Sequence, residues 1–464
     1  MQYLTIWDLI LTPVYLLVLS FIAKRQRDKR YPPGNPLRKY YMPGLYVKFA
    51  GAIFIALVFQ YYYHGGDTYN YFQHSQIINS SLSNSVTVWI ELITRSDYSK
   101  DPRLYEYVSN LYWYDDPASY SVAVISSIFG LLNGTTYIPI ALLFAFFAYT
   151  GIWAMFRTFT NIYPALHKQL ALAFLFIPST FVWGSAIFKD TVCMFGLGWM
   201  VYTTFRLFIN KDFSAKNIIL LMLSFYLVAK IKLYIILAFI PALGLWLLLT
   251  YSHRIRSAAV RWLVSIFFMG VTVALFLFFS NKFSQELNKY SLDKITKTAE
   301  ITRSYILQVS GDEGSGYDLG EMDGSVKGML AKFPQGVVVT LFRPFLWEAK
   351  KPIVLLSALE SLIMLFLTLQ LFFNNGMNIF KWTRSDPNLI FFLIFSLIFA
   401  FAVGVSSYNF GTLSRYKIPC MPFYTAYLII LINRQKLEKP SRKRRAFIPY
   451  NVSTNTGIRS MPRS

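Results

Sequence analysis

Three short segments of this chain carry residue types that could do chemistry, and each lies next to a long apolar run. They are His64-Gly65-Gly66-Asp67-Thr68-Tyr69-Asn70-Tyr71, Phe188-Lys189-Asp190 and Leu413-Ser414-Arg415-Tyr416-Lys417. A carboxylate can accept a proton from an attacking hydroxyl as a general base. A guanidinium binds phosphate or diphosphate in a bidentate way. Together they predict chemistry on an anionic, lipid-linked substrate at one membrane face.

We expect two carboxylates, Asp67 and Asp190, to be catalytic. Asp67 follows two glycines, which let the backbone turn sharply and approach a ligand closely. Asp190 interrupts two apolar runs downstream of Pro178, which should break the helix. Two alternatives stay open: Asp67 could be a solvated carboxylate that caps the next helix, and Lys189-Asp190 could form an ion-paired hairpin between spans.

Six cations on the same predicted face are candidates for holding a phosphate group, since a cation in low-dielectric surroundings can stabilise a departing diphosphate. They are Lys189, Lys230, Lys232, Arg343, Arg415 and Lys417. Snorkelling would explain Lys230 and Lys232 equally well, and anchoring at the interface would explain the arginines. Tyr69 and Tyr71 offer aromatic faces on which a sugar ring could stack.

The composition requires a membrane environment for these residues. Of 464 residues, 55% are hydrophobic and 15% charged, the mean hydropathy is +0.41, and several apolar runs reach the roughly 20 residues that cross a bilayer. The net charge of +22 lies mainly in short loops, as the positive-inside rule predicts. This distribution argues against nucleic-acid binding. Cys193 and Cys420 lie in apolar context and indicate neither a disulfide framework nor a metal site.

The pattern predicts an all-α polytopic membrane protein with about eleven transmembrane helices, its N-terminus outside and its C-terminus cytoplasmic. The expected spans are Leu4–Ala23, Val47–Tyr63, Tyr137–Phe156, Leu170–Ile187, Thr191–Phe208, Asn217–Ala229, Leu233–Tyr251, Trp262–Ser280, Ile353–Phe373, Leu389–Val405 and Ile418–Ile432. The basic residues between the first two spans, from Lys24 to Lys48, should form a cytoplasmic loop.

Residues 1–433 should form one membrane domain with two long outer segments, 64–135 and 281–351. The apolar stretch Tyr120–Leu132 is short, and as a span it would invert every later loop, so we expect it to lie in the interface. In the second outer segment we expect an amphipathic helix over 282–308 and a flexible acidic loop over 312–323. Residues 434–464 should form a basic, disordered cytoplasmic tail.

The overall layout resembles the GT-C superfamily of integral membrane glycosyltransferases, and is similar to the EpsG-like and Wzy-like polysaccharide polymerases. The resemblance rests on an acid near the end of a span (Asp67), an interfacial segment ending in Phe129-Gly130-Leu131-Leu132-Asn133-Gly134, the break from Pro178 to Asp190, and Arg415-Tyr416 before a proline-bearing last span. The chain departs from the GT-C pattern in its extra N-terminal span and in lacking an acidic pair at Asp67.

The resemblance implies transfer of a sugar from polyprenyl phosphate or diphosphate at the periplasmic face of a bacterial inner membrane, in cell-surface polysaccharide synthesis. Asp67 would match the first-loop acid of the GT-C enzymes and Asp190 a second acidic site. Arg343 and Arg415 would correspond to arginines that hold phosphate in the polymerases. No motif specifies a cofactor, and a divalent metal ion stays open. The rival functions are a transporter or lipid flippase for an anionic substrate, and a structural subunit of an envelope assembly.

Overall fold

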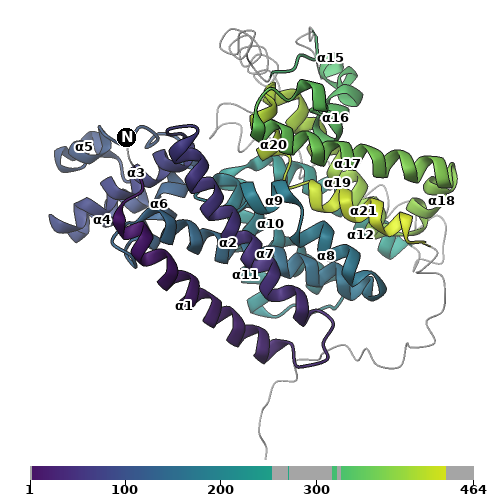
Figure 1. The fold of residues 1–464 in the computed structure, drawn as a ribbon, viewed down its shortest axis with the longest axis horizontal. Coiled ribbons are helices and arrows are strands. Elements are labelled where there is room, and N and C mark those ends of the chain that lie inside the picture. The colour runs from purple at the N-terminus through teal and green to yellow at the C-terminus, as the bar shows by residue number, and fades with distance from the viewer. Residues whose placement is uncertain (1–2, 253–269, 271–315, 321–325, 435–464) are drawn as a thin grey trace, which may run out of the picture.

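The computed structural model describes residues 3–252, 270, 316–320 and 326–434 (Figure 1). Within these ranges every regular element is a helix, and one isolated β-bridge pairs Gly316 with Asn409. The α-helices are α1 (Ile6–Arg30), α2 (Arg38–Tyr61), α3 (Asp67–Ser80), α4 (Val86–Thr94), α5 (Pro102–Val108), α6 (Pro117–Gly130), α7 (Tyr137–Ile162), α8 (His167–Leu175), α9 (Pro178–Trp183), α10 (Lys189–Phe208), α11 (Ala215–Ile231), α12 (Leu233–Ser252), α15 (Val326–Ala331), α16 (Phe333–Phe342), α17 (Pro352–Asn375), α18 (Asn378–Ser385), α19 (Pro387–Ser407), α20 (Phe410–Tyr416) and α21 (Met421–Ile432).

Some of the predicted elements fall outside the described residues. They are the span Trp262–Ser280 apart from Gly270, the amphipathic helix over 282–308, the acidic loop over 312–323 apart from 316–320, and the tail beyond Arg434.

Six helices are long and apolar enough, by length and composition, to cross a membrane: α1, α2, α7, α12, α17 and α19. They coincide with six of the eleven predicted spans, so the prediction of an all-helical multi-pass membrane protein is confirmed at that level. Of the other predicted spans within the described residues, Thr191–Phe208 lies in the 20-residue helix α10, which is not one of these six, and the remaining three are shorter helices or are divided. Leu170–Ile187 is split between α8 and α9, α11 has 17 residues and α21 has 12.

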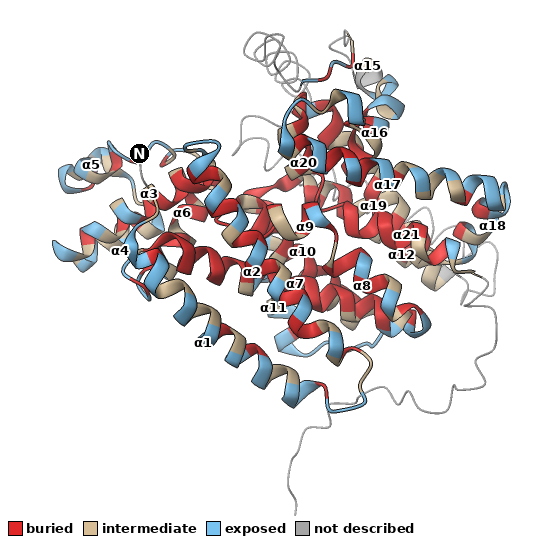
Figure 2. Ribbon diagram, in the orientation of Figure 1, coloured by how far each residue is buried: buried red, intermediate tan, exposed pale blue. Residues whose placement is uncertain are grey.

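The N-terminal and C-terminal helices occupy opposite sides of the molecule, with α7 and α10 between them (Figure 1). Helix α7 is the most enclosed of the six long apolar helices, with 83% of its apolar window buried, whereas α1 has 17% (Figure 2). An apolar helix that is exposed on most of its surface is suited to face lipid. Helix α1 therefore lies at the perimeter and α7 forms the centre.

Glycines let several of these helices approach at backbone distance. A Cβ atom on Gly198 of α10 would lie 2.1 Å from the carbonyl oxygen of Gly151 in α7. A Cβ atom on Gly404 of α19 would lie 2.2 Å from the carbonyl oxygen of Gly336 in α16. Small residues at such crossings are typical of helix packing in membranes.

The segment 64–135, predicted to be the first outer segment, folds on a small apolar core of its own. Ile78, Val88, Leu92 and Leu104 are buried together there with Tyr120, whose hydroxyl donates to the Leu92 carbonyl at 3.0 Å. Helix α6, which covers most of the stretch Tyr120–Leu132, has 14 residues and is therefore about 21 Å long. That length is short of the roughly 30 Å hydrocarbon core.

The second predicted span begins earlier than the sequence indicates. Helix α2 begins at Arg38, and Lys48, predicted to lie in a cytoplasmic loop, is inside the helix with 2% of its surface exposed. Its ammonium donates to the carbonyl oxygens of Thr180 at 3.1 Å and Gly184 at 2.6 Å. The loop assignment was wrong, because these carbonyls replace the water that a buried ammonium would lose.

Candidate functional site

A tight turn between α2 and α3 places the carboxylate of Asp67. His64, Gly65 and Gly66 have φ angles of 54°, 145° and 125°, and a Cβ atom on Gly66 would lie 2.8 Å from the Phe59 ring. The turn makes Asp67 the first residue of α3. A carboxylate is favoured there by the partial positive charge of the helix N-terminus.

The helix break predicted at Pro178 is present and leads to Asp190. Pro178 begins the six-residue helix α9, whose N-terminal end is held by Glu360: this carboxylate accepts from the Ser179 amide at 2.8 Å and the Ser179 hydroxyl at 2.7 Å. Lys48 binds the carbonyls at the other end. Opposite charges at its two ends match the dipole of α9. The chain then enters α10, whose first two residues are Lys189 and Asp190.

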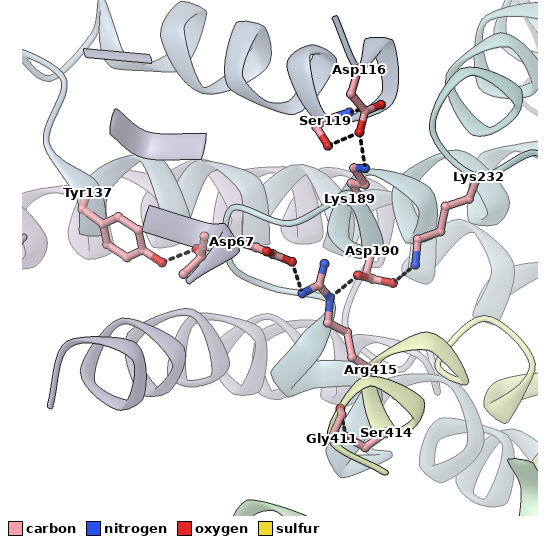
Figure 3. Close-up of polar contacts among 11 residues, drawn as sticks. Asp67, Asp116, Ser119, Tyr137, Lys189, Asp190, Lys232, Gly411, Ser414 and Arg415 are labelled. Atoms are coloured by element: carbon pink, nitrogen blue, oxygen red, sulfur yellow. Dashed lines mark hydrogen bonds and ion pairs between the residues drawn. The ribbon is translucent and has the colours of Figure 1, made fainter. Parts of the chain in front are cut away.

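Four charged side chains from distant parts of the sequence form one connected row, the charge chain Asp67–Arg415–Asp190–Lys232 (Figure 3). Arg415, near the end of α20, donates from Nη1 to Asp67 at 2.8 Å and from Nε to Asp190 at 2.6 Å. Lys232, between α11 and α12, donates to the other oxygen of Asp190 at 2.5 Å. The sequence predicted all four as site residues, and the fold brings them together.

Asp67 is the most exposed member of the charge chain. The side chains of Asp190, Lys232 and Arg415 are 0%, 5% and 12% exposed, whereas that of Asp67 is 45% exposed. Within the described residues, Asp67 Oδ1 and Arg415 Nη2 have no hydrogen-bond partner. The charge chain therefore has a buried end, where Asp190 and Lys232 are paired with each other. At its exposed end, one oxygen of Asp67 and one nitrogen of Arg415 are available to a ligand.

Aromatic rings surround the cations of the charge chain. The Arg415 guanidinium lies 4.4 Å from the centroid of the Phe188 ring, and the Lys232 ammonium lies 4.0 Å from that of Tyr416. Such contacts favour a cation in surroundings with little water. They also hold the Arg415 side chain beside Asp67.

Lys189 belongs to a second ion pair next to the charge chain. Its ammonium lies 3.4 Å from Asp116, which caps α6 by accepting from the amides of Ala118 and Ser119 and from the Ser119 hydroxyl at 2.6 Å (Figure 3). Burial raises the pKa of Asp116, but the Lys189 ammonium and these hydrogen bonds lower it more, so the net pKa lies below its ordinary value. Sequence reasoning missed the pairing of Asp116, although Asp-Pro before an apolar run is a helix-start signal.

Besides Lys189, three predicted phosphate-binding cations lie outside the charge chain. Lys417 is buried and donates to the Ser361 hydroxyl at 2.8 Å. Arg343 pairs with Glu348, Nε to Oε2 at 3.0 Å, and its guanidinium lies 5.2 Å from the Phe410 ring centroid. The Lys230 ammonium lies 5.8 Å from the Tyr226 ring centroid on α11.

The two predicted sugar-stacking tyrosines are packing residues in this structure. Tyr69 is fully buried, stacks on Tyr3 with ring centroids 4.1 Å apart and donates to the Ala56 carbonyl at 2.8 Å. Tyr71 is 2% exposed and packs against Trp113 at 4.5 Å. The two rings are two positions apart and lie on different faces of α3: Tyr69 packs toward α2 and α7, and Tyr71 packs toward the segment between α5 and α6.

In comparisons with protein-family models, curated proteins and solved structures, none matches this chain. Among the described residues, no three His, Cys, Asp or Glu side chains lie close enough together to hold a metal ion.

Proposed function

We propose that this chain is an integral membrane glycosyltransferase or oligosaccharide polymerase. It uses a sugar donor linked to polyprenyl phosphate or diphosphate, at the extracytoplasmic face, in cell-surface glycan synthesis. One observation supports this function above the others: the half-exposed carboxylate of Asp67 lies 2.8 Å from Arg415, whose other contacts are buried. A general base and a phosphate-binding cation are thus held side by side at the open end of the charge chain.

The chemistry assigned to these two residues is a displacement at the anomeric carbon. The acceptor hydroxyl gives its proton to Asp67, and its oxygen bonds to the anomeric carbon. The bond from that carbon to the phosphate oxygen breaks, and its electron pair leaves with the lipid phosphate or diphosphate. The Arg415 guanidinium stabilises the negative charge that develops on the leaving group.

Asp190 and Lys232 act in this proposal as positioning residues. Both oxygens of Asp190 are already used, one by Arg415 and one by Lys232. A carboxylate that is 0% exposed and doubly paired has no free oxygen for an acceptor hydroxyl. Its proposed task is to fix the plane of the Arg415 guanidinium, which is a different role from the catalytic one that the sequence predicted.

The first experiment compares cells lacking the protein, complemented with the wild type, with Asp67→Asn or with the control Asp115→Asn. Asp115 is an exposed carboxylate in the same outer segment. Mass spectrometry of lipid-linked glycans should show an intermediate that the wild type and the control clear and that Asp67→Asn does not, at equal membrane expression. A truncated unit would indicate single-sugar addition, and a complete repeat would indicate polymerisation. Full activity of Asp67→Asn would remove Asp67 from the mechanism.

A transporter or flippase for an anionic substrate is the second candidate. The observation that favours it is the contact between Asp67 on α3 and Arg415 on α20, which joins an N-terminal helix to a C-terminal one. An anion that binds Arg415 in place of Asp67 could separate these two helices. Formation of a new glycosidic bond by the purified protein without a gradient would exclude transport as its sole activity. An unchanged glycan pool together with loss of a partner complex would favour a structural subunit instead.

A further inference from the structure

A second feature of the molecule lies among the C-terminal helices. A cavity of about 520 Å³ is lined by residues of α16, α17, α18, α19 and α21. Its volume is in the range of small-molecule sites. Its walls are mainly aliphatic and aromatic, with Leu393 and Leu397 one turn apart on α19 and only partly buried there.

The polar groups in the wall are already satisfied. The Thr368 hydroxyl donates to the Met364 carbonyl at 2.7 Å and lies 2.9 Å from the Tyr424 hydroxyl. The Thr383 and Tyr427 hydroxyls lie 2.9 Å apart. A polar ligand would therefore find few free hydrogen-bond partners in the wall, and its own polar groups would lose their hydrating water on entry. The cavity favours an apolar chain.

Arg384 supplies one charge at the edge of this apolar cavity. It is the one charged residue of the lining, is exposed, and makes no ion pair within the described residues. It lies on α18, an amphipathic helix that also carries Lys381 and the exposed Phe380 and that follows the exposed Met377. Basic amphipathic helices of this kind lie in the plane of the membrane interface. A phosphate group at the headgroup level would thus meet the Arg384 guanidinium.

Arg384 and the charge chain lie beyond opposite ends of α19. This helix has 21 residues and is about 31 Å long, close to the thickness of the hydrocarbon core. Helix α18 precedes its N-terminus, and α20, with Arg415, follows its C-terminus. A lipid whose phosphate contacts Arg384 therefore belongs to the leaflet opposite the one that the charge chain faces.

We infer that the cavity binds an anionic phospholipid of that opposite leaflet, with one acyl chain between α17, α19 and α21 and its phosphate on Arg384. This site is separate from the proposed glycosyl-transfer site, and the inference does not rest on that function. A bidentate guanidinium contact to phosphate, combined with a preformed apolar cavity, gives selectivity for headgroup charge as well as retention of the chain.

The test is native mass spectrometry of the full chain after detergent exchange, with phosphatidylglycerol or phosphatidylcholine added as the probe. The wild type should retain phosphatidylglycerol about tenfold better than phosphatidylcholine, as expected for one charge-assisted contact. Arg384→Gln should bind both lipids equally, whereas Lys381→Gln, on the same helix but outside the cavity lining, should keep the wild-type preference. Leu393→Trp fills the cavity and should lose both lipids.

Arg384 is exposed, so Arg384→Gln tests the inference even if Leu393→Trp does not fold. Equal retention of the two lipids by the wild type would overturn the inference. So would an unchanged preference in Arg384→Gln. Displacement of phosphatidylglycerol from the wild type by an equal amount of polyprenyl phosphate would also overturn it and would assign the cavity to the lipid of a sugar donor.

Discussion

Arg415 is the residue at which the two carboxylates of the site meet. Nε and Nη1 point to different acceptors, and the planar fork holds Asp67 and Asp190 at a fixed separation. A lysine would bring the same charge but could not serve both acceptors in that geometry. The shape of the side chain, as well as its charge, is therefore part of the site.

Arg415→Lys should lower the rate of glycan assembly by roughly 100-fold, the order seen when one preorganised donor is lost from an active site. The measurement is turnover of the lipid-linked intermediate by membranes that contain equal amounts of protein. Arg434→Lys, at the far end of α21, serves as the control for a generic loss of arginine. A rate within a few-fold of wild type would show that a point charge suffices and that Arg415 does not bridge the two acids during turnover.

His74 should make the stability of the folded protein depend on pH. It lies in α3 with its ring 5.5 Å from Trp113, and burial lowers its pKa from 6.5 to about 4. The folded state thus binds fewer protons at His74 than the unfolded state does. The stability that the neutral ring contributes is present above pH 6.5 and is lost as the pH falls toward 4.

The thermal unfolding midpoint of the wild type should consequently fall between pH 6.5 and 4 by more than that of His74→Gln. Carboxylates titrate in both proteins over this range. The difference between the two plots of unfolding midpoint against pH therefore gives the contribution of His74 alone. Parallel curves over this range would contradict a neutral buried ring.

Sequence reasoning found the charge chain because its members interrupt apolar runs, where a charge is costly without a partner. It could not pair them, because Asp67 and Arg415 are 348 positions apart. It also grouped Lys417 and Arg343 with them. In the sequence, a cation next to a span looks the same whether it faces the site or, as here, contacts Ser361 (Lys417) or Glu348 (Arg343). Tyr69 and Tyr71 were assigned to a ligand because periodicity alone does not show which helix face packs inward.

At the scale of elements, the functional residues lie at or near the ends of helices, where the chain enters or leaves a regular segment. Asp67 and Asp190 lie in the first turns of α3 and α10, Arg415 lies on the seven-residue α20, and Lys232 lies where α11 gives way to α12. The breaks at Pro178 and Gly65-Gly66 could be predicted from residue type. The buried supports Lys48 and Glu360 could not, because each resembles a residue of a loop or interface until its partner on α9 is known.

Gly198→Ala should destabilise the crossing of α7 and α10. Its added Cβ meets the backbone of Gly151, which cannot move aside, and overpacking of this kind costs about 1–3 kcal/mol. Because α10 carries Lys189 and Asp190, activity should fall with stability. A lower thermal unfolding midpoint in detergent would check this.

Gly196→Ala is the matched control on the same helix. Its Cβ would lie 2.5 Å from a methyl group of Val228 and 3.2 Å from the Ser224 carbonyl oxygen, both on α11. The closest clash is with a side chain, whereas every near atom at Gly198 is backbone, so the loss of stability should be smaller. If the two variants had equal midpoints, close backbone approach at Gly151 would not be what holds α10 in place.

At the scale of the whole molecule, the positive-inside rule predicts a topology that labelling from one side of the membrane can test. The outer segment with α3 to α6 and the basic turn between α10 and α11 should lie on opposite sides of the membrane. Tyr112 is 84% exposed in the outer segment, and Lys216 is exposed at the start of α11. The native Cys193 and Cys420 are buried, so the unmodified chain should react little with a thiol reagent.

In intact cells a membrane-impermeant thiol reagent should label Tyr112→Cys and should label Lys216→Cys only after the membrane is opened. Labelling of both from outside would contradict the predicted orientation.

The class of fold and six of the spans could be predicted from composition and from the length of the apolar runs. The split of Leu170–Ile187 into two helices followed from the residue type of Pro178, since hydropathy alone averages over that break.

The order in which the members of the charge chain leave the ribosome has a consequence for biosynthesis. Lys232 follows Asp190 by 42 residues, whereas Arg415 follows it by 225. The most deeply buried carboxylate can therefore find its first counter-charge while most of the C-terminal half is still unmade, as suits a chain that folds from its N-terminus during synthesis. Asp67 is made early, but its partner Arg415 is made 348 residues later, near the end of translation. Assembly of the site is thus a late step, and a chain that ends before α20 would enter the membrane without it.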